Sequence, residues 1–159
     1  MNDELRKSLD DVMEEIESIE KWISKNSMDR NTKYLIKYAV IRSCSVIETV
    51  FKKLIFNVMS DECNELVKNY LQKKIVGSST NPKTGNIEKV LQEINSSWKK
   101  EFQDYLAENT EKKGDLNSLV TLRNDFAHGT DSSSATIGNI KKYFESGIDI
   151  LDKLENILK

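Results

Sequence analysis

The residues with the clearest capacity for chemistry lie in the segment RNDFAH, residues 123–128. His128 is the single histidine of the sequence, and Arg123 and Asn124 precede it by five and four positions. Histidine accepts or releases a proton near neutral pH, arginine presents a rigid fork of N–H donors to a phosphate, and asparagine can position either group. Together these residue types favour phosphodiester chemistry that needs no metal.

The spacing of apolar residues predicts a helix over residues 116–128, which must position these side chains. Arg123 falls near the middle of the apolar face of this helix, where an unpaired charge is costly to bury. Asn124 and His128 are four residues apart and therefore share one side of the helix. Because a break in an apolar pattern often marks a functional site, we expect the three side chains to surround one small space at the helix end.

A second anomaly lies in the long helix predicted over residues 29–59. Its apolar stripe comprises Tyr34, Tyr38, Ile41, Cys44, Ile47, Phe51, Ile55 and Val58. Glu48 falls inside this stripe, and its carboxylate could pair with Arg123 or orient a neighbouring side chain. Two simpler interpretations stay open. In the first, Arg123 and Glu48 form a buried ion pair whose sole role is to set helix register. In the second, His128 stabilises the helix dipole at the C-terminus of its helix and has no catalytic role.

The remaining pattern predicts further helices at five places. They cover residues 3–25, 60–76, 87–94, 98–106 and 136–158. Ser60 followed by two acidic residues resembles a helix start, and Asp115 is the expected cap of the helix over 116–128. The segments 77–86 and 130–136 are rich in small polar residues and read as a loop and a turn.

The composition places these helices in one all-α domain over residues 1–159. The chain has one proline and six glycines, so helix breakers are scarce, and no repeat or linker divides it. A four-helix bundle with additional short helices is the economical architecture.

Cys44 and Cys63 have apolar neighbours and are therefore interpreted as reduced thiols in a cytoplasmic protein. No apolar run is long enough to span a membrane, so no membrane partner is expected.

Charge and motif content narrow the function further. The formal net charge of −2 creates no overall field that attracts an anionic polymer. Nucleic-acid binding would therefore rest on local basic clusters or on a site formed between subunits. The sequence has no metal-ligand spacing, no phosphate-binding glycine loop and no supported Ser-His-Asp set, so we expect neither a metal nor a cofactor.

The segment LNSLVTLRNDFAHG, residues 116–129, resembles the HEPN domain family. This all-α family has as its motif an arginine, usually followed by a polar residue, and a histidine after four to six intervening positions. Arg123, Asn124 and His128 fit with four intervening residues. The segment RSCSVIETVFKKL, residues 42–54, resembles the long second helix of the family with its embedded acid. The chain is most similar to RiboL-PSP-type and related stand-alone bacterial members.

The resemblance implies a metal-independent endoribonuclease that acts as a homodimer, with the motif helices of both subunits at one cleft. The ribose 2′-OH would attack the adjacent phosphate and leave 2′,3′-cyclic phosphate and 5′-hydroxyl ends. His128 would transfer protons, Arg123 would stabilise the developing charge, Asn124 would position substrate or histidine, and Glu48 would support them. Such proteins commonly serve as toxins in toxin–antitoxin or phage-defence systems, so RNA and an antitoxin or neighbouring regulator are the implied partners.

The alternative within the same resemblance is a non-catalytic HEPN dimer that acts as an interaction or nucleotide-binding module. The net negative charge of the chain favours this alternative. One departure concerns regulation: some family toxins carry a tyrosine two positions after the histidine, which a partner enzyme modifies with adenylate. This chain has Thr130 at that position, and we therefore do not predict that mode of neutralisation.

Overall fold

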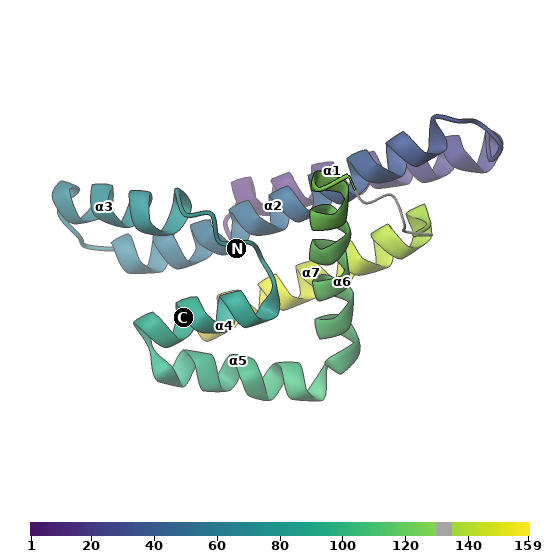
Figure 1. Cartoon of the computed structure of the whole chain (residues 1–159). Coiled ribbons are helices and arrows are strands. Elements are labelled where there is room, and N and C mark those ends of the chain that lie inside the picture. Colours follow the sequence, from purple (N-terminus) through teal and green to yellow (C-terminus); the bar gives the residue numbers. More distant parts are fainter. Residues whose placement is uncertain (130–134) are drawn as a thin grey trace.

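The computed structural model describes residues 1–129 and 135–159, and every regular element in these ranges is a helix (Figure 1). The elements are α1 (Asp3–Lys25), α2 (Thr32–Ser60), α3 (Glu65–Leu71), the π-helix η1 (Gln72–Val76), α4 (Thr84–Ile94), α5 (Ser96–Glu108), α6 (Thr110–Ala127) and α7 (Ile137–Ile157). The predicted all-α class is therefore confirmed. Thr130 and most of the polar turn predicted over 130–136 lie outside the described residues.

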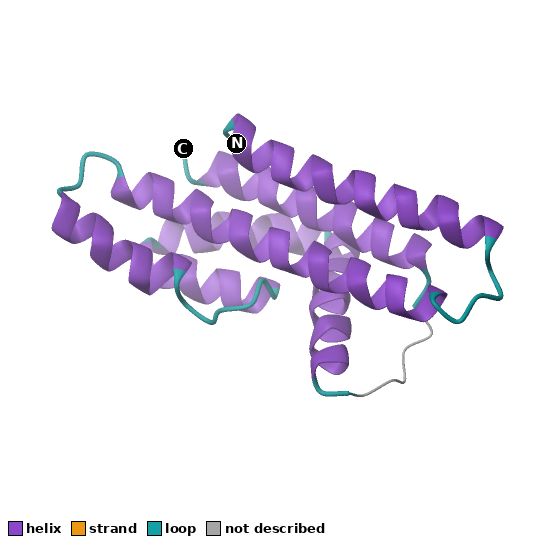
Figure 2. Ribbon diagram, turned by 90° about the horizontal axis from the view of Figure 1, so that it is seen from above, coloured by secondary structure: helices purple, strands orange, loops and turns teal. Residues whose placement is uncertain are grey.

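The four main helices expected from the sequence are α1, α2, α6 and α7. Helices α1, α2 and α7 lie side by side, and α6 crosses them steeply while packing against α7 and α2 (Figures 1 and 2). Helices α4 and α5 form a hairpin whose second helix contacts α7, and α3 with η1 folds back along α2. None of the helices in the described ranges is long and apolar enough to cross a membrane.

Close packing of α7 on α2 holds the core together. A Cβ atom added at Gly147 of α7 would lie 2.5 Å from Cδ1 of Ile47 and 3.6 Å from Cδ1 of Leu116. Ile47 and Leu116 are fully buried, so the absent side chain at Gly147 lets three helices meet at one point. This junction fixes α6 against its neighbours and thereby positions the end of α6 that carries the RNDFAH segment.

The predicted start of the motif helix was wrong. Helix α6 begins at Thr110, and Asp115 is a buried residue inside it rather than its cap. The Asp115 carboxylate accepts a hydrogen bond of 2.8 Å from the Ser146 hydroxyl of α7. Gly114 adopts ordinary helical backbone, so it does not interrupt the helix. Tertiary contact with α7 therefore stabilises Asp115 at a helix-interior position that local propensity disfavours.

The predicted helix start at Ser60 was also wrong. Ser60 is the last residue of α2, and the chain turns through Glu62, which has a φ of 57°. Asn64 is the actual cap of α3, because its side chain accepts a hydrogen bond of 3.1 Å from the N–H of Val67. Both places carry residues that can cap a helix, and local sequence did not distinguish between them.

The apolar stripe predicted for α2 was only partly correct. Cys44, Ile47, Phe51 and Ile55 are buried, whereas four other members of the stripe are exposed. The exposed members are Tyr34, Tyr38, Ile41 and Val58, at 58%, 47%, 51% and 40%. Helix α2 contacts α1, α3, α6, α7 and η1, so the arc that it buries is broader than one stripe and is rotated toward residues such as Val40, Val46 and Val50.

Candidate functional site

The C-terminal end of α6 passes from the core into solvent within three turns. Leu119 and Val120 are fully buried, Phe126 is half-buried, and Ala127 and His128 are exposed. Figure 2 shows this end of the helix extending beyond the side of the α1–α2–α7 layer. The predicted site residues therefore lie where a rigid, packed helix meets the surface, and a macromolecular ligand can reach them there.

Arg123 and Asn124 are in direct contact. Both side chains are half-buried, and Nη1 of Arg123 donates a hydrogen bond of 3.1 Å to Oδ1 of Asn124. None of the ion pairs in the described part of the chain involves Arg123. The guanidinium has five N–H donors, so most of its capacity to bind an anion is still available.

Glu48 and Arg123 form no ion pair in the described part of the chain. Oε1 of Glu48 instead lies 2.6 Å from Nζ of Lys52, one turn further along α2. The same Nζ donates a 2.6 Å hydrogen bond to the carbonyl of Ser78. Only 5% of the Lys52 side chain is exposed, so this ammonium group requires such partners. Lys52 was not predicted as a partner of Glu48, although its spacing of four residues from Glu48 on one helix was a usable indication.

Cys44 of α2 is close enough to both charges to respond to them. Burial raises the pKa of the Cys44 thiol to about 11, the Arg123 guanidinium opposes this rise, and the Glu48 carboxylate adds to it. The thiol is therefore protonated at neutral pH and acts as a small apolar side chain. Arg123 and Glu48 thus belong to one electrostatic neighbourhood between α6 and α2 without forming a direct bond.

His128 ends the helix. Its N–H donates to the carbonyl of Asn124 at 3.0 Å, and Gly129 then turns the chain with a φ of 74° and donates to the carbonyl of Phe126 at 3.3 Å. Asn124 and His128 are therefore joined across the last helical turn, as the four-residue spacing predicts. Within the described residues, no hydrogen bond connects the His128 imidazole to Arg123 or Asn124.

One further cation lies at this end of α6. Nζ of Lys37, on the N-terminal half of α2, is 5.3 Å from the centre of the Phe126 ring. The helix end thus offers a guanidinium, an amide and an exposed imidazole, which together can bind a phosphate and exchange a proton with it. No three His, Cys, Asp or Glu side chains gather as a metal site anywhere in 1–129 and 135–159.

A family model described as RiboL-PSP-HEPN matches residues 7–159. No curated protein and no solved structure matches the chain. The matched region begins in the second turn of α1 and continues to the end of the chain, so it contains both Glu48 and the RNDFAH segment.

Proposed function

The chain belongs to the RiboL-PSP-HEPN family, and from this membership we propose that it is a metal-independent endoribonuclease that acts as a homodimer. HEPN domains form a family of ribonucleases that generally bind RNA and dimerise. The observation that carries the proposal is the half-buried Arg123, which within residues 1–129 and 135–159 bonds only to Asn124, on the same helix end as the exposed His128. A guanidinium in this position needs an anion, and an RNA phosphate supplies one.

The proposed reaction is cleavage of a phosphodiester by the neighbouring ribose. A His128 imidazole removes the proton of the 2′-OH, whose oxygen forms a bond to the adjacent phosphorus. The bond from phosphorus to the 5′-oxygen breaks, and this oxygen takes up a proton as it leaves. The products are a 2′,3′-cyclic phosphate and a 5′-hydroxyl. Arg123 stabilises the negative charge that builds up on the phosphate, and Asn124 holds Arg123 in position.

The homodimer follows from the proton balance of this reaction. One proton is removed from the 2′-OH and another is delivered to the leaving oxygen, while each chain carries one histidine. Two copies that bring their α6 ends to one cleft supply both a base and an acid. They also double the number of arginines at the phosphate, which compensates for the lack of overall attraction between RNA and a chain with a net charge of −2. From the same family membership we propose that the protein acts as a toxin or in phage defence.

An RNA cleavage assay in the presence of EDTA tests the proposal. Wild-type protein should cut single-stranded RNA and leave a 5′-hydroxyl end that polynucleotide kinase phosphorylates with ATP without prior phosphatase treatment. His128→Ala and Arg123→Ala should each lose roughly 100-fold or more in rate, as expected for loss of an acid–base or charge-stabilising group. Arg30→Ala, at an exposed arginine of the α1–α2 loop, is the matched control and should cleave normally. Full activity of His128→Ala would refute the catalytic assignment.

A second function, a non-catalytic HEPN interaction module, is favoured by the exposed apolar residues of α2. Tyr34, Tyr38 and Ile41 lie three or four residues apart on one helix face and are about half exposed. This function predicts that wild-type protein cleaves none of a diverse set of RNAs. It also predicts that Tyr34→Asp abolishes association with a partner while His128→Ala leaves that association intact.

A further inference from the structure

Two adjoining hollows form one shallow groove along the seam between α1 and the N-terminal half of α2. Their volumes are about 520 and 410 Å³, and both are lined by Ser18, Ile19 and Leu35. Trp22 and Tyr34 complete the apolar end of the groove, and the lining of both hollows contains no residue of α6. The groove is therefore separate from the helix end that the proposed function places at a cleft between subunits.

The other end of the groove is acidic, because Asp11, Glu14 and Glu15 of α1 line it. Asp11 pairs with Lys7 at 2.7 Å, and Glu15 pairs with Arg42 at 2.8 Å. Glu14 is exposed and forms no ion pair within the described ranges. Helix α1 as a whole carries eight acidic and four basic residues, so the groove lies in a region of negative potential.

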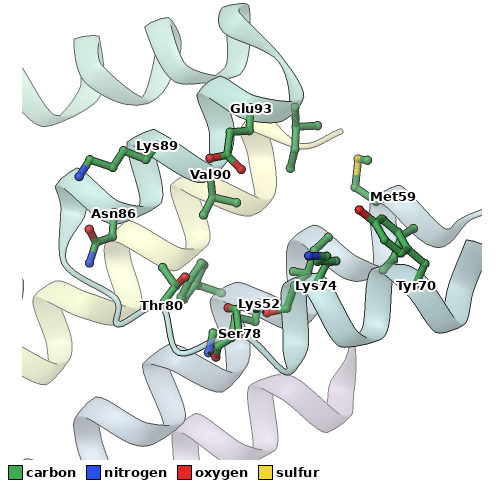
Figure 3. A pocket seen from close by; sticks show the side chains of 14 residues that line it. Lys52, Met59, Tyr70, Lys74, Ser78, Thr80, Asn86, Lys89, Val90 and Glu93 are labelled. Atoms are coloured by element: carbon green, nitrogen blue, oxygen red, sulfur yellow. Dashed lines mark hydrogen bonds between the residues drawn. The ribbon is translucent and has the colours of Figure 1, made fainter.

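A surface of the opposite character lies on the α3–η1 segment, residues 65–76. Leu66 and Tyr70 are exposed at 82% and 60%, and they share one face because they are four residues apart. Figure 3 shows Tyr70 and Lys74 extending from this segment, and Nζ of Lys74 lies 5.9 Å from the centre of the Tyr70 ring. Lys73 is exposed beside them. The segment contains three basic residues and one acidic residue, so we call it the basic ridge.

The groove and the basic ridge do not meet within one chain. The groove borders the first turns of α2, whereas α3 follows the last residue of that helix. Figure 1 accordingly shows α3 at one end of the molecule and the α1–α2 loop at the other. Neither α3 nor η1 contacts α1. A contact between the two surfaces must therefore join two molecules.

We propose that the groove binds the basic ridge of a second copy of this chain in a head-to-tail contact. Both surfaces pass from an apolar part to a charged part, and their charges are opposite. Leu66 and Tyr70 cover the apolar end of the groove, and the lysines of the basic ridge face Glu14. Because the two surfaces differ, each molecule can bind a neighbour on either side, and assembly continues beyond a pair. This contact is additional to the proposed α6 homodimer and does not depend on RNA cleavage.

Light scattering of the full chain between about 1 µM and 1 mM tests this proposal. The average mass should rise with concentration beyond that of a dimer, and about 1 M salt should reduce the rise by screening the charges. Leu66→Asp removes the apolar anchor of the basic ridge, and Glu14→Lys reverses the unpaired charge of the groove. Each substitution should raise the concentration needed for assembly roughly tenfold. Both residues are exposed, so both variants should keep the wild-type fold.

A mixture of the two variants distinguishes a head-to-tail contact from a general loss of association. Leu66→Asp keeps an intact groove and Glu14→Lys keeps an intact basic ridge, so the mixture should assemble at lower concentration than either variant alone. The matched controls are Ala107→Asp and Glu108→Lys, at exposed residues of α5 outside both surfaces, and each should assemble like wild type. His128→Ala should also assemble like wild type, so failure of this contact is distinguishable from failure of the proposed cleavage.

Three results would overturn the proposal. In the first, the mass of wild-type protein stops at that of a dimer throughout the concentration range. In the second, the mixture of Leu66→Asp and Glu14→Lys assembles no better than the separate variants. In the third, the α5 controls weaken assembly as much as the variants of the groove and the basic ridge.

Discussion

At the scale of single residues, the distribution of partners among the charged groups decides which of them can act on a ligand. Lys52 is almost fully buried and uses Glu48 and the carbonyl of Ser78 as partners. Arg123 is half-buried, and among the described residues its guanidinium bonds only to the neutral amide of Asn124. Glu48 therefore stabilises α2 and its contact with residue 78, whereas in the proposed function Arg123 directs its charge at an RNA phosphate.

The Lys52–Glu48 pair predicts an asymmetry between two substitutions. Glu48→Ala leaves the buried ammonium with one carbonyl partner and should lower the free energy of unfolding by roughly 2–4 kcal/mol. Lys52→Met removes the buried charge itself and leaves a partly exposed carboxylate that water can solvate, so its cost should be about 1 kcal/mol. Urea denaturation of both variants measures the difference. Equal losses would mean that the two groups are solvated alike in the folded protein.

At the scale of helices, close packing rather than propensity sets the role of two glycines. Gly114 lies inside α6, and a Cβ atom added there would meet nothing within 4 Å. Gly147 lies inside α7, where a Cβ atom would press on the buried Ile47. Glycine therefore destabilises α6 at position 114 without a packing benefit. At position 147 glycine is required, because α7 approaches its neighbours so closely that a side chain would not fit.

Alanine substitution at these two glycines should have opposite effects. Gly114→Ala should raise the free energy of unfolding by about 0.5–1 kcal/mol, the usual gain of alanine over glycine in a helix. Gly147→Ala should lower it by about 1 kcal/mol or more, because overpacking displaces Ile47. Chemical denaturation under one buffer condition compares them directly. A Gly147→Ala variant as stable as Gly114→Ala would show that Ile47 moves aside without cost.

At the scale of the whole molecule, one surface region collects the features that a second copy would use. The end of α6 contacts the N-terminal half of α2, as the position of Lys37 over Phe126 shows. The same half of α2 exposes Tyr34, Tyr38 and Ile41. In the proposed homodimer, this region would cover the apolar side chains and bring the two His128 residues to one cleft.

A shared cleft predicts how mixtures of active and inactive subunits behave. If one cleft requires both histidines, then equal amounts of wild-type and His128→Ala subunits, allowed to exchange, should retain about a quarter of wild-type activity. Independent sites would retain about half. RNA cleavage across a series of mixing ratios distinguishes a quadratic from a linear dependence on the wild-type fraction. A linear dependence would contradict the shared cleft, whatever the oligomeric state.

The sequence by itself determined the all-α class, the four main helices and the position of the motif at the end of one of them. These features depend on residue periodicity and on short spacings within one helix, which local chemistry controls. The position of Arg123 in an apolar face was also visible from the sequence. The family resemblance drawn from the RNDFAH segment is confirmed by the match over residues 7–159.

Only the tertiary structure decided which groups meet across helices. It showed that Asp115 is buried against Ser146, that Lys52 donates a hydrogen bond to the carbonyl of Ser78, and that Tyr34, Tyr38 and Ile41 face outward. Each of these facts depends on how neighbouring helices rotate and cross, which is set by contacts between residues far apart in the chain. A periodic pattern records that a face is apolar. It does not record which other helix covers that face, so burial and charge pairing emerge only when the helices pack.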